Sequence, residues 1–95
     1  MVIKLKPDFA VAHYNLGNAL LNKGRTSEAI SHYKMAIGLK PDYADAYNNL
    51  GIALVAKQKI EEAISHFKMA IKLKPDYATA QKNLEMVLLR LEELE

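Results

Sequence analysis

The three prolines of this 95-residue chain, Pro7, Pro41 and Pro75, are spaced 34 residues apart, and the sequence between them repeats. Residues 7–40 and 41–74 are identical at 21 of 34 positions. A third copy begins at Pro75 and soon diverges, while the opening MVIKLKPD matches the end of a copy. A fixed period of this length is typical of stacked supersecondary units, each burying its apolar face against its neighbours.

The apolar spacing within each copy predicts two helices, because apolar side chains recur every three to four residues. In the first copy, one helical face carries Phe9, Ala12, Leu16, Ala19 and Leu20, and a second carries Ala29, Ile30, Tyr33, Ala36 and Ile37. Short connections make consecutive helices antiparallel neighbours. We expect an all-α fold with no strand and with helices near 9–23, 27–40, 43–57, 61–74 and 77–94, preceded by a helical stub near 1–5.

Glycines take two kinds of position in this pattern. Gly24 suits the residue just after a helix, and Gln58 replaces it in the second copy as a weaker stop signal. Gly17 and Gly51 fall inside helices, where glycine costs about 1 kcal/mol relative to alanine. We expect close approach of the partner helix, at the alanines 29 and 63, to compensate for that cost.

Composition excludes several classes of function. Thirteen Lys and Arg residues against eleven Asp and Glu leave a net charge of +2, too balanced to indicate a nucleic-acid partner. The absence of cysteine excludes disulfides, thiolate nucleophiles and cysteine-bound metals, and it fits a reducing compartment such as the cytoplasm. No apolar run is long enough to span a bilayer, so we expect one soluble domain with no membrane partner.

The two copies resemble the tetratricopeptide repeat (TPR) family. The residues that carry the resemblance are Leu16, Gly17, Leu20, Gly24, Ala29, Tyr33, Ala36 and Pro41, then Leu50, Gly51, Leu54, Ala63, Phe67, Ala70 and Pro75. The resemblance implies a right-handed α-α superhelix of antiparallel helix pairs, with a concave groove lined by the first helix of each pair. It divides the chain into a partial repeat at 1–9, TPR 1 at 10–43, TPR 2 at 44–77 and a C-terminal capping helix at 78–95.

The resemblance also implies which side chains face the groove. By position in each unit, the candidate peptide-binding residues are Tyr14, Asn15, Asn18, Leu21, Asn48, Asn49, Ile52, Val55 and Asn83. Asn15, Asn49 and Asn83 recur at the 34-residue period. An amide both donates and accepts, so a ladder of three would bind the backbone of an extended peptide. The alternative, which stays open at this point, is that each asparagine bonds a neighbouring helix or meets water.

Some members of the family bind the C-terminal carboxylates of chaperones through a clamp of lysines, asparagines and an arginine. This chain matches the clamp positions only at Asn18 and Asn49. Tyr14, Thr79 and Asn83 stand where the cations of the clamp should be. Without those charges the charge-assisted hydrogen bonds to a carboxylate are missing, so we expect no binding of chaperone tails.

No motif for catalysis or for a cofactor is present. Gly17 and Gly24 are not followed by the G-K-[ST] of a phosphate-binding loop, and neither a Ser-His-Asp signature nor H-E-x-x-H occurs. His32 and His66 take the same place in successive copies. Duplication of the repeat explains these two histidines better than a shared metal does. We therefore expect no enzyme activity, no cofactor and no metal.

The sequence favours a protein–protein interaction module, or scaffold, that binds a peptide or a partner helix in its groove. Two alternatives remain. The apolar stripe of the last helix exceeds what a cap requires, and it comprises Leu84, Val87, Leu88, Leu91 and Leu94. At the other end, the sequence matches the end of a second helix whose first helix is absent, through Met1, Val2, Ile3 and Leu5. Such edges favour a homodimer.

The second alternative is substrate recruitment for a larger enzyme. The segment PDYADAYNNLG resembles the repeats of O-linked N-acetylglucosamine transferases, so the enzyme would be of that kind.

Overall fold

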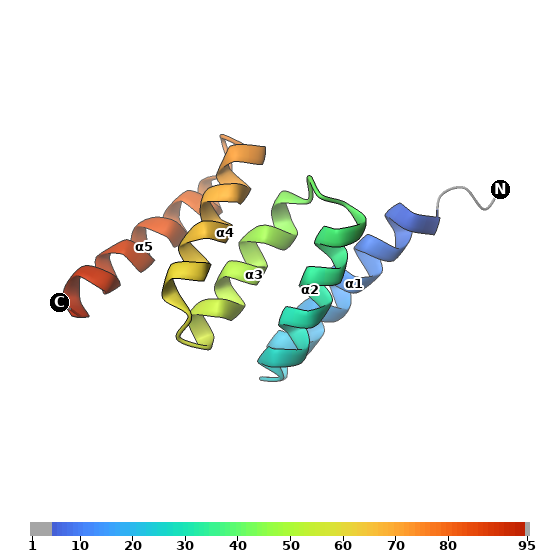
Figure 1. Cartoon of the computed structure of the whole chain (residues 1–95), viewed down its shortest axis with the longest axis horizontal. Coiled ribbons are helices and arrows are strands. Elements are labelled where there is room, and N and C mark those ends of the chain that lie inside the picture. Colours follow the sequence, from blue (N-terminus) through green and yellow to red (C-terminus); the bar gives the residue numbers. More distant parts are fainter. Residues whose placement is uncertain (1–4, 95) are drawn as a thin grey trace.

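The computed structural model describes residues 5–94, with the side chains of residues 9–93. This part of the chain consists of five helices and contains no strand: α1 Leu5–Asn22, α2 Thr26–Leu39, α3 Ala44–Ala56, α4 Ile60–Leu73 and α5 Ala78–Leu94 (Figure 1). The predicted all-α fold is confirmed. The bounds of α2 to α5 agree with the predicted helices to within about one residue at each end.

The start of α1 differs from the sequence prediction. The helix begins at Leu5 and continues through Pro7, whereas the prediction ended one helix before Pro7 and began the next at residue 9. Pro7 lies in the first turn of α1, where a backbone N–H has no acceptor within the helix, so the proline ring removes no hydrogen bond. Leu5 therefore belongs to α1, and the remainder of the predicted stub, residues 1–4, lies outside the described residues.

The turns inside the two helix pairs share one geometry. Gly24 has a φ of 79°, and its amide and that of the next residue donate to the carbonyls of Leu21 and Leu20. Gln58 has a φ of 63°, and one repeat later its amide and that of Lys59 donate to the carbonyls of Val55 and Leu54. This left-handed helix ending suits glycine best. The predicted role of Gly24 is confirmed, and Gln58 adopts the same conformation although it carries a side chain.

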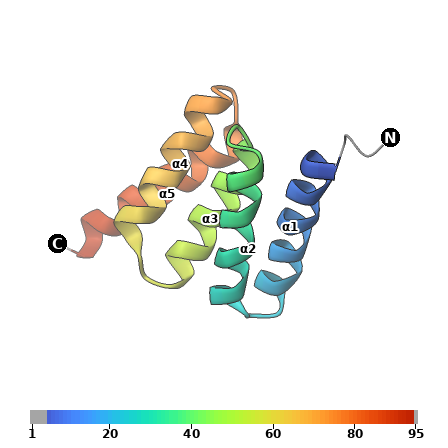
Figure 2. The same cartoon turned by 45° about the vertical axis from the view of Figure 1, so that its right-hand side comes forward.

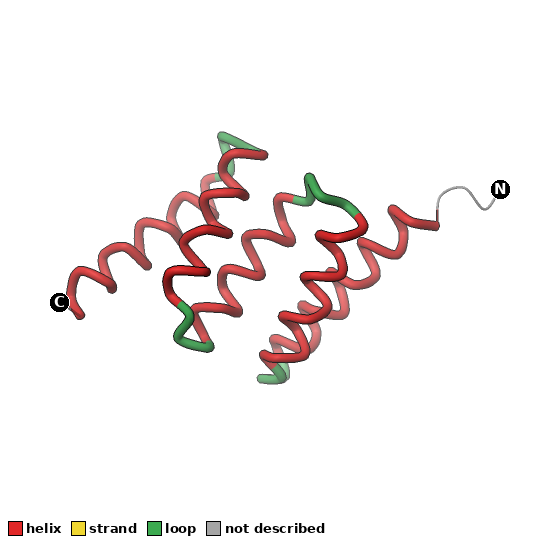
Figure 3. The backbone as a smooth tube through the Cα atoms, viewed as in Figure 1, coloured by secondary structure: helices red, strands yellow, loops and turns green. Residues whose placement is uncertain are grey.

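The helices lie in two layers. The first layer comprises α1, α3 and α5, and α2 and α4 pack across it (Figures 1 and 2). The chain alternates between the layers through short loops, as the tube in Figure 3 shows. Within the described chain, α1 touches α3 and α3 touches α5, but α2 and α4 do not meet. Because the helices of the first layer are closer together, the stack curves and this layer forms its inner face.

The core lies between the layers and repeats with the sequence. Its fully buried side chains include Tyr33, Leu50, Leu54 and Phe67. A Cβ built on Gly51 would lie 2.6 Å from Cε1 of Phe67, and one on Gly17 would lie 2.7 Å from Cε1 of Tyr33. Both distances are far inside van der Waals contact, so the partner ring requires glycine at each position. The atoms nearest to each added Cβ belong to these rings, and close approach of the partner helix at the alanines 29 and 63 stays a prediction.

Candidate functional site

The nine predicted groove residues come from the three helices of the inner layer. Helix α1 carries Tyr14, Asn15, Asn18 and Leu21, α3 carries Asn48, Asn49, Ile52 and Val55, and α5 carries Asn83. Their exposure differs: Asn15 and Ile52 are exposed, Asn48 is 2% exposed, and the other six are half-buried. One part of this face is therefore free, and another is occupied by contacts between repeats.

Four asparagines and a tyrosine form a chain of hydrogen bonds across the inner layer. Nδ2 of Asn49 donates to Oδ1 of Asn18 at 2.8 Å and to the hydroxyl of Tyr14 at 3.2 Å. Oδ1 of Asn49 accepts from Nδ2 of Asn48 at 3.2 Å. Oδ1 of Asn48 accepts in turn from Nδ2 of Asn83 at 3.0 Å. We call this chain the junction network, because its members tie α1 to α3 and α3 to α5.

The junction network gives different roles to the three asparagines that recur at the 34-residue period. Asn49 and Asn83 each donate to a side chain 35 residues earlier, in the preceding repeat. Asn15 is exposed and has no hydrogen bond within the described chain. The alternative in which the asparagine bonds a neighbouring helix therefore holds for Asn49 and Asn83. The structure does not contain a ladder of three equivalent free amides.

A buried polar pair in the first repeat has an apolar counterpart in the second. The hydroxyl of Tyr33 donates to Oδ1 of Asn18 at 2.5 Å. Burial of the ring raises the pKa of Tyr33 to about 12, so the hydroxyl keeps its proton near neutral pH. One repeat later, Phe67 and Ile52 replace both partners, so neither member of this pair is left without the other. This pairing was not predicted, although the paired difference between the two copies is visible in the sequence.

The charges on the inner face lie at the start of α3 and along α5. Asp45 lies in the first turn of α3. Burial raises the pKa of Tyr77 most, and the neighbouring Asp45 raises it further. Lys82 and Arg90 are exposed on α5, and neither forms an ion pair within the described chain. The inner side of α5 thus presents positive charge that no acidic side chain of the described residues neutralises by contact.

A small pocket opens on the inner side of α5. It has a volume of about 160 Å³ and is lined by Ile52, Val55, Phe67, Asn83, Met86 and Val87. Three of the predicted groove residues, Ile52, Val55 and Asn83, therefore come together around one cavity. Met86, which also lines the cavity, is 60% exposed at its edge.

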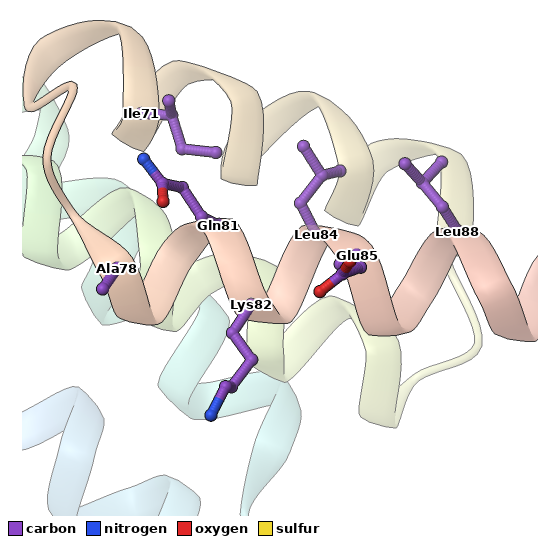
Figure 4. Close-up of a pocket in the computed structure, with 7 residues that line it drawn as sticks. All are labelled: Ile71, Ala78, Gln81, Lys82, Leu84, Glu85 and Leu88. Atoms are coloured by element: carbon purple, nitrogen blue, oxygen red, sulfur yellow. The ribbon is translucent and has the colours of Figure 1, made fainter.

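A larger pocket of about 480 Å³ lies between α4 and α5. Figure 4 shows Ile71 of α4 above Gln81, Leu84 and Leu88 of α5, while Lys82 points to the opposite side. Glu85, which also lines this pocket, occupies the repeat position of the two helical glycines. This is the place in which the second helix of a third repeat would pack.

The described residues contain no group of three or more side chains that could hold a metal ion. His13 and His32 stack on each other, with their Nδ1 atoms 3.0 Å apart. Nδ1 of His66 lies 2.7 Å from the carbonyl of Glu62 instead. The hydrogen-bond partners of His32 and His66 thus differ, although the ring of His66 lies beside Tyr47, at the repeat position of His13. Within the same residues, no helix is both long and apolar enough to cross a bilayer.

Stacked antiparallel helix pairs that repeat every 34 residues, with a hydrogen-bonded inner layer, define a helical repeat protein. Models of the family described as "TPR repeat" and "Tetratricopeptide repeat" match the chain, the first at residues 17–58 and the second at residues 1–31 and 44–77. The chain belongs to the tetratricopeptide repeat family. No curated protein matches it in sequence.

Among solved structures, the chain is similar to the second TPR of Spaghetti (RPAP3) bound to the HSP90 peptide SRMEEVD. The TM-score is 0.89 at 24% sequence identity, and the match covers 99% of this chain and 87% of that chain. At this identity the likeness establishes the fold, which agrees with the family assignment.

Proposed function

We propose that this chain is a non-catalytic interaction module that binds a peptide segment on its inner face. The observation that carries the proposal is the group of exposed apolar side chains there. Ile52, Met86 and Leu89 lie around the small pocket or one helical turn from it, and contacts between repeats leave them exposed. The structurally similar TPR domain of Spaghetti, which has a peptide bound, supports binding of a peptide by this fold.

The junction network shapes how such a peptide is held. Asn49 uses both of its N–H donors inside the protein, so its side chain is fixed before any ligand arrives. Asn83 keeps Oδ1 and one N–H without a partner among the described residues. Asn15 is exposed, and its side-chain amide forms no hydrogen bond within the described residues. We therefore propose that Asn83 and Asn15 bond the ligand backbone, and that Asn49 holds the surface in shape.

The proposed ligand differs from a chaperone tail. Asn18 and Asn49, at the two matching clamp positions, bond each other at 2.8 Å. No cation stands at the three remaining clamp positions. A terminal carboxylate placed there would meet amides and hydroxyls in place of positive charge, which removes the stronger charge-assisted bonds.

The test is selection of binders from a library of random linear peptides, followed by affinity measurements on two matched variants. Leu89, on α5, and Met35, on α2, are 56% and 48% exposed, so replacing either by serine leaves the core intact. We expect Leu89→Ser to weaken binding of the selected peptides about tenfold and Met35→Ser to change it little. Equal losses in the two variants, or a selection that yields no binder, would contradict the proposal.

Self-association is a second candidate, supported by the end surfaces of the stack. Leu16 is 44% exposed on α1, whereas its equivalent Leu50 is 1% exposed because α2 covers it. The larger pocket beside α5 is a second end surface, and Leu88 in its lining is 45% exposed. Light scattering over a dilution series measures the outcome: a dimer that dissociates on dilution supports this candidate, and the mass of a monomer at every concentration rejects it.

A further inference from the structure

We propose that the small pocket is an aliphatic socket that selects ligands: it accepts one leucine-, isoleucine- or methionine-sized side chain from an acidic peptide. The socket is formed by Ile52, Val55, Phe67, Asn83, Met86 and Val87. The inference rests on the proposed function and names the class of peptide that the inner face binds.

The socket exists because the second repeat lacks hydrogen bonds that the first repeat makes. In the first repeat, the hydroxyl of Tyr33 and Nδ2 of Asn49 both bond Oδ1 of Asn18, at 2.5 and 2.8 Å. Ile52 and Phe67 take the places of Asn18 and Tyr33 one repeat later, so neither bond can form. Two of the three polar groups that meet in the first repeat are thus apolar in the second, and Asn83, the counterpart of Asn49, lies beside an opening with largely apolar walls.

The size and lining of the socket fit an aliphatic group. Its volume is about 160 Å³, and five of its six lining side chains are apolar. An apolar cavity of about 150 Å³ accepts a molecule as large as benzene, so this one has room for a branched aliphatic side chain. Removal of that side chain and of the exposed walls from water provides the driving force.

Asn83 supplies the polar contact at the edge of the socket. One of its N–H groups donates to Asn48. Ile52 stands where Asn18 accepts from Asn49 in the first repeat, so the other N–H has no acceptor in the described structure. Oδ1 of Asn83 also has no hydrogen bond there. A side-chain amide offers the donor and the acceptor that one residue of an extended backbone requires. A peptide whose aliphatic side chain enters the socket therefore places its backbone beside this amide.

The charge beside the socket selects an acidic ligand. Lys82 and Arg90 lie four residues before and after Met86, which places all three on one side of α5. Lys82 also borders the larger pocket, and Figure 4 shows its side chain extending away from α4. Neither cation is paired in the described chain, and no acidic residue lines the socket. Aspartate or glutamate next to the aliphatic residue of the ligand is therefore favoured, by an attraction that salt screens.

The experiment uses a library of random linear peptides of about twelve residues, selected on the full chain. The expected result is enrichment of Leu, Ile or Met with Asp or Glu within a few positions. One double variant and a control then test the socket. Ile52→Asn with Phe67→Tyr copies the polar arrangement of the first repeat into the second. Met35→Ser, at an exposed position of α2, is the control.

Binding of the selected peptides is expected to fall about tenfold in the Ile52→Asn, Phe67→Tyr variant and to stay within about threefold in Met35→Ser. Replacing the aliphatic residue of the peptide by alanine should weaken binding to the wild type about tenfold and add little loss in the first variant. Lys82→Gln with Arg90→Gln should weaken binding and reduce its dependence on salt. Circular dichroism verifies the fold, and Met86→Ser, at an exposed position, replaces the double variant if that variant does not fold.

Different outcomes contradict different claims. Peptides that lose affinity in Leu89→Ser but bind the socket variants as they bind the wild type overturn the socket and leave inner-face binding intact. Enrichment of basic peptides, or of peptides without an aliphatic residue, also overturns it. A selection that yields no peptide overturns the proposed function and the socket together.

Discussion

Replacing Phe67 by alanine is expected to lower the free energy of unfolding by about 3–5 kcal/mol. The ring is 1% exposed, packs in the core cluster and lies directly over Gly51. Small domains have only about 5–15 kcal/mol of stability in total, so this loss is a large share of it. Urea denaturation followed by circular dichroism measures the change. A loss below about 1 kcal/mol would contradict the core packing described above.

The same ring accounts for the glycine at position 51. A methyl group there would lie 2.6 Å from the ring, so Gly51→Ala should destabilise the protein by about 1–3 kcal/mol, although alanine is the better helix former. Gly38, in α2, is the matched control because a Cβ added to it would meet no atom within 4 Å. Gly38→Ala should stabilise the protein by up to about 1 kcal/mol. In the Phe67→Ala background, most of the Gly51→Ala penalty should disappear.

The second large effect is expected for Asn49→Ala, with a loss of about 1–3 kcal/mol in the free energy of unfolding. The change deprives the hydroxyl of Tyr14 and Oδ1 of Asn18 of a donor, and Nδ2 of Asn48 of its acceptor. Asn48 is buried, so water cannot fully replace the lost bond. Denaturant titration of the variant and of the wild type gives the difference.

Asn15→Ala is the matched control for this measurement. Asn15 holds the same position in the repeat as Asn49, but it is exposed and has no hydrogen bond within the described chain. Its replacement should change stability by no more than about 0.5 kcal/mol. Equal losses in the two variants would mean that the junction network does not connect the repeats as the hydrogen bonds indicate. Peptide-binding tests should therefore use exposed side chains, because a loss of binding in Asn49→Ala would include a structural effect.

The fold could be predicted almost completely from the sequence, because a 34-residue period and helical apolar spacing leave few alternatives. The start of α1 could not, because a proline is compatible both with the residues after a helix and with the first turn of the next one. Pro41 takes the first role, in the turn between α2 and α3, and Pro7 takes the second. The local sequences around the two prolines are too similar to separate these cases.

The candidate site could be predicted only in outline. Position in the repeat identified Ile52, Val55 and Asn83, which meet around one pocket. It could not show whether an asparagine bonds a ligand or the adjacent repeat, since one amide suits both partners. That depends on what lies within hydrogen-bonding distance in three dimensions, and for Asn49 this is Asn18 and Tyr14.

The most direct test of inner-face binding is NMR chemical-shift mapping of the labelled chain with the tightest selected peptide. The largest shifts are expected for the methyl groups of Ile52, Met86 and Leu89 and for the side-chain amide of Asn83, all on α3 and α5. Largest shifts on α2 and α4 instead, for example at Met35 and Leu73, would contradict binding on the inner face.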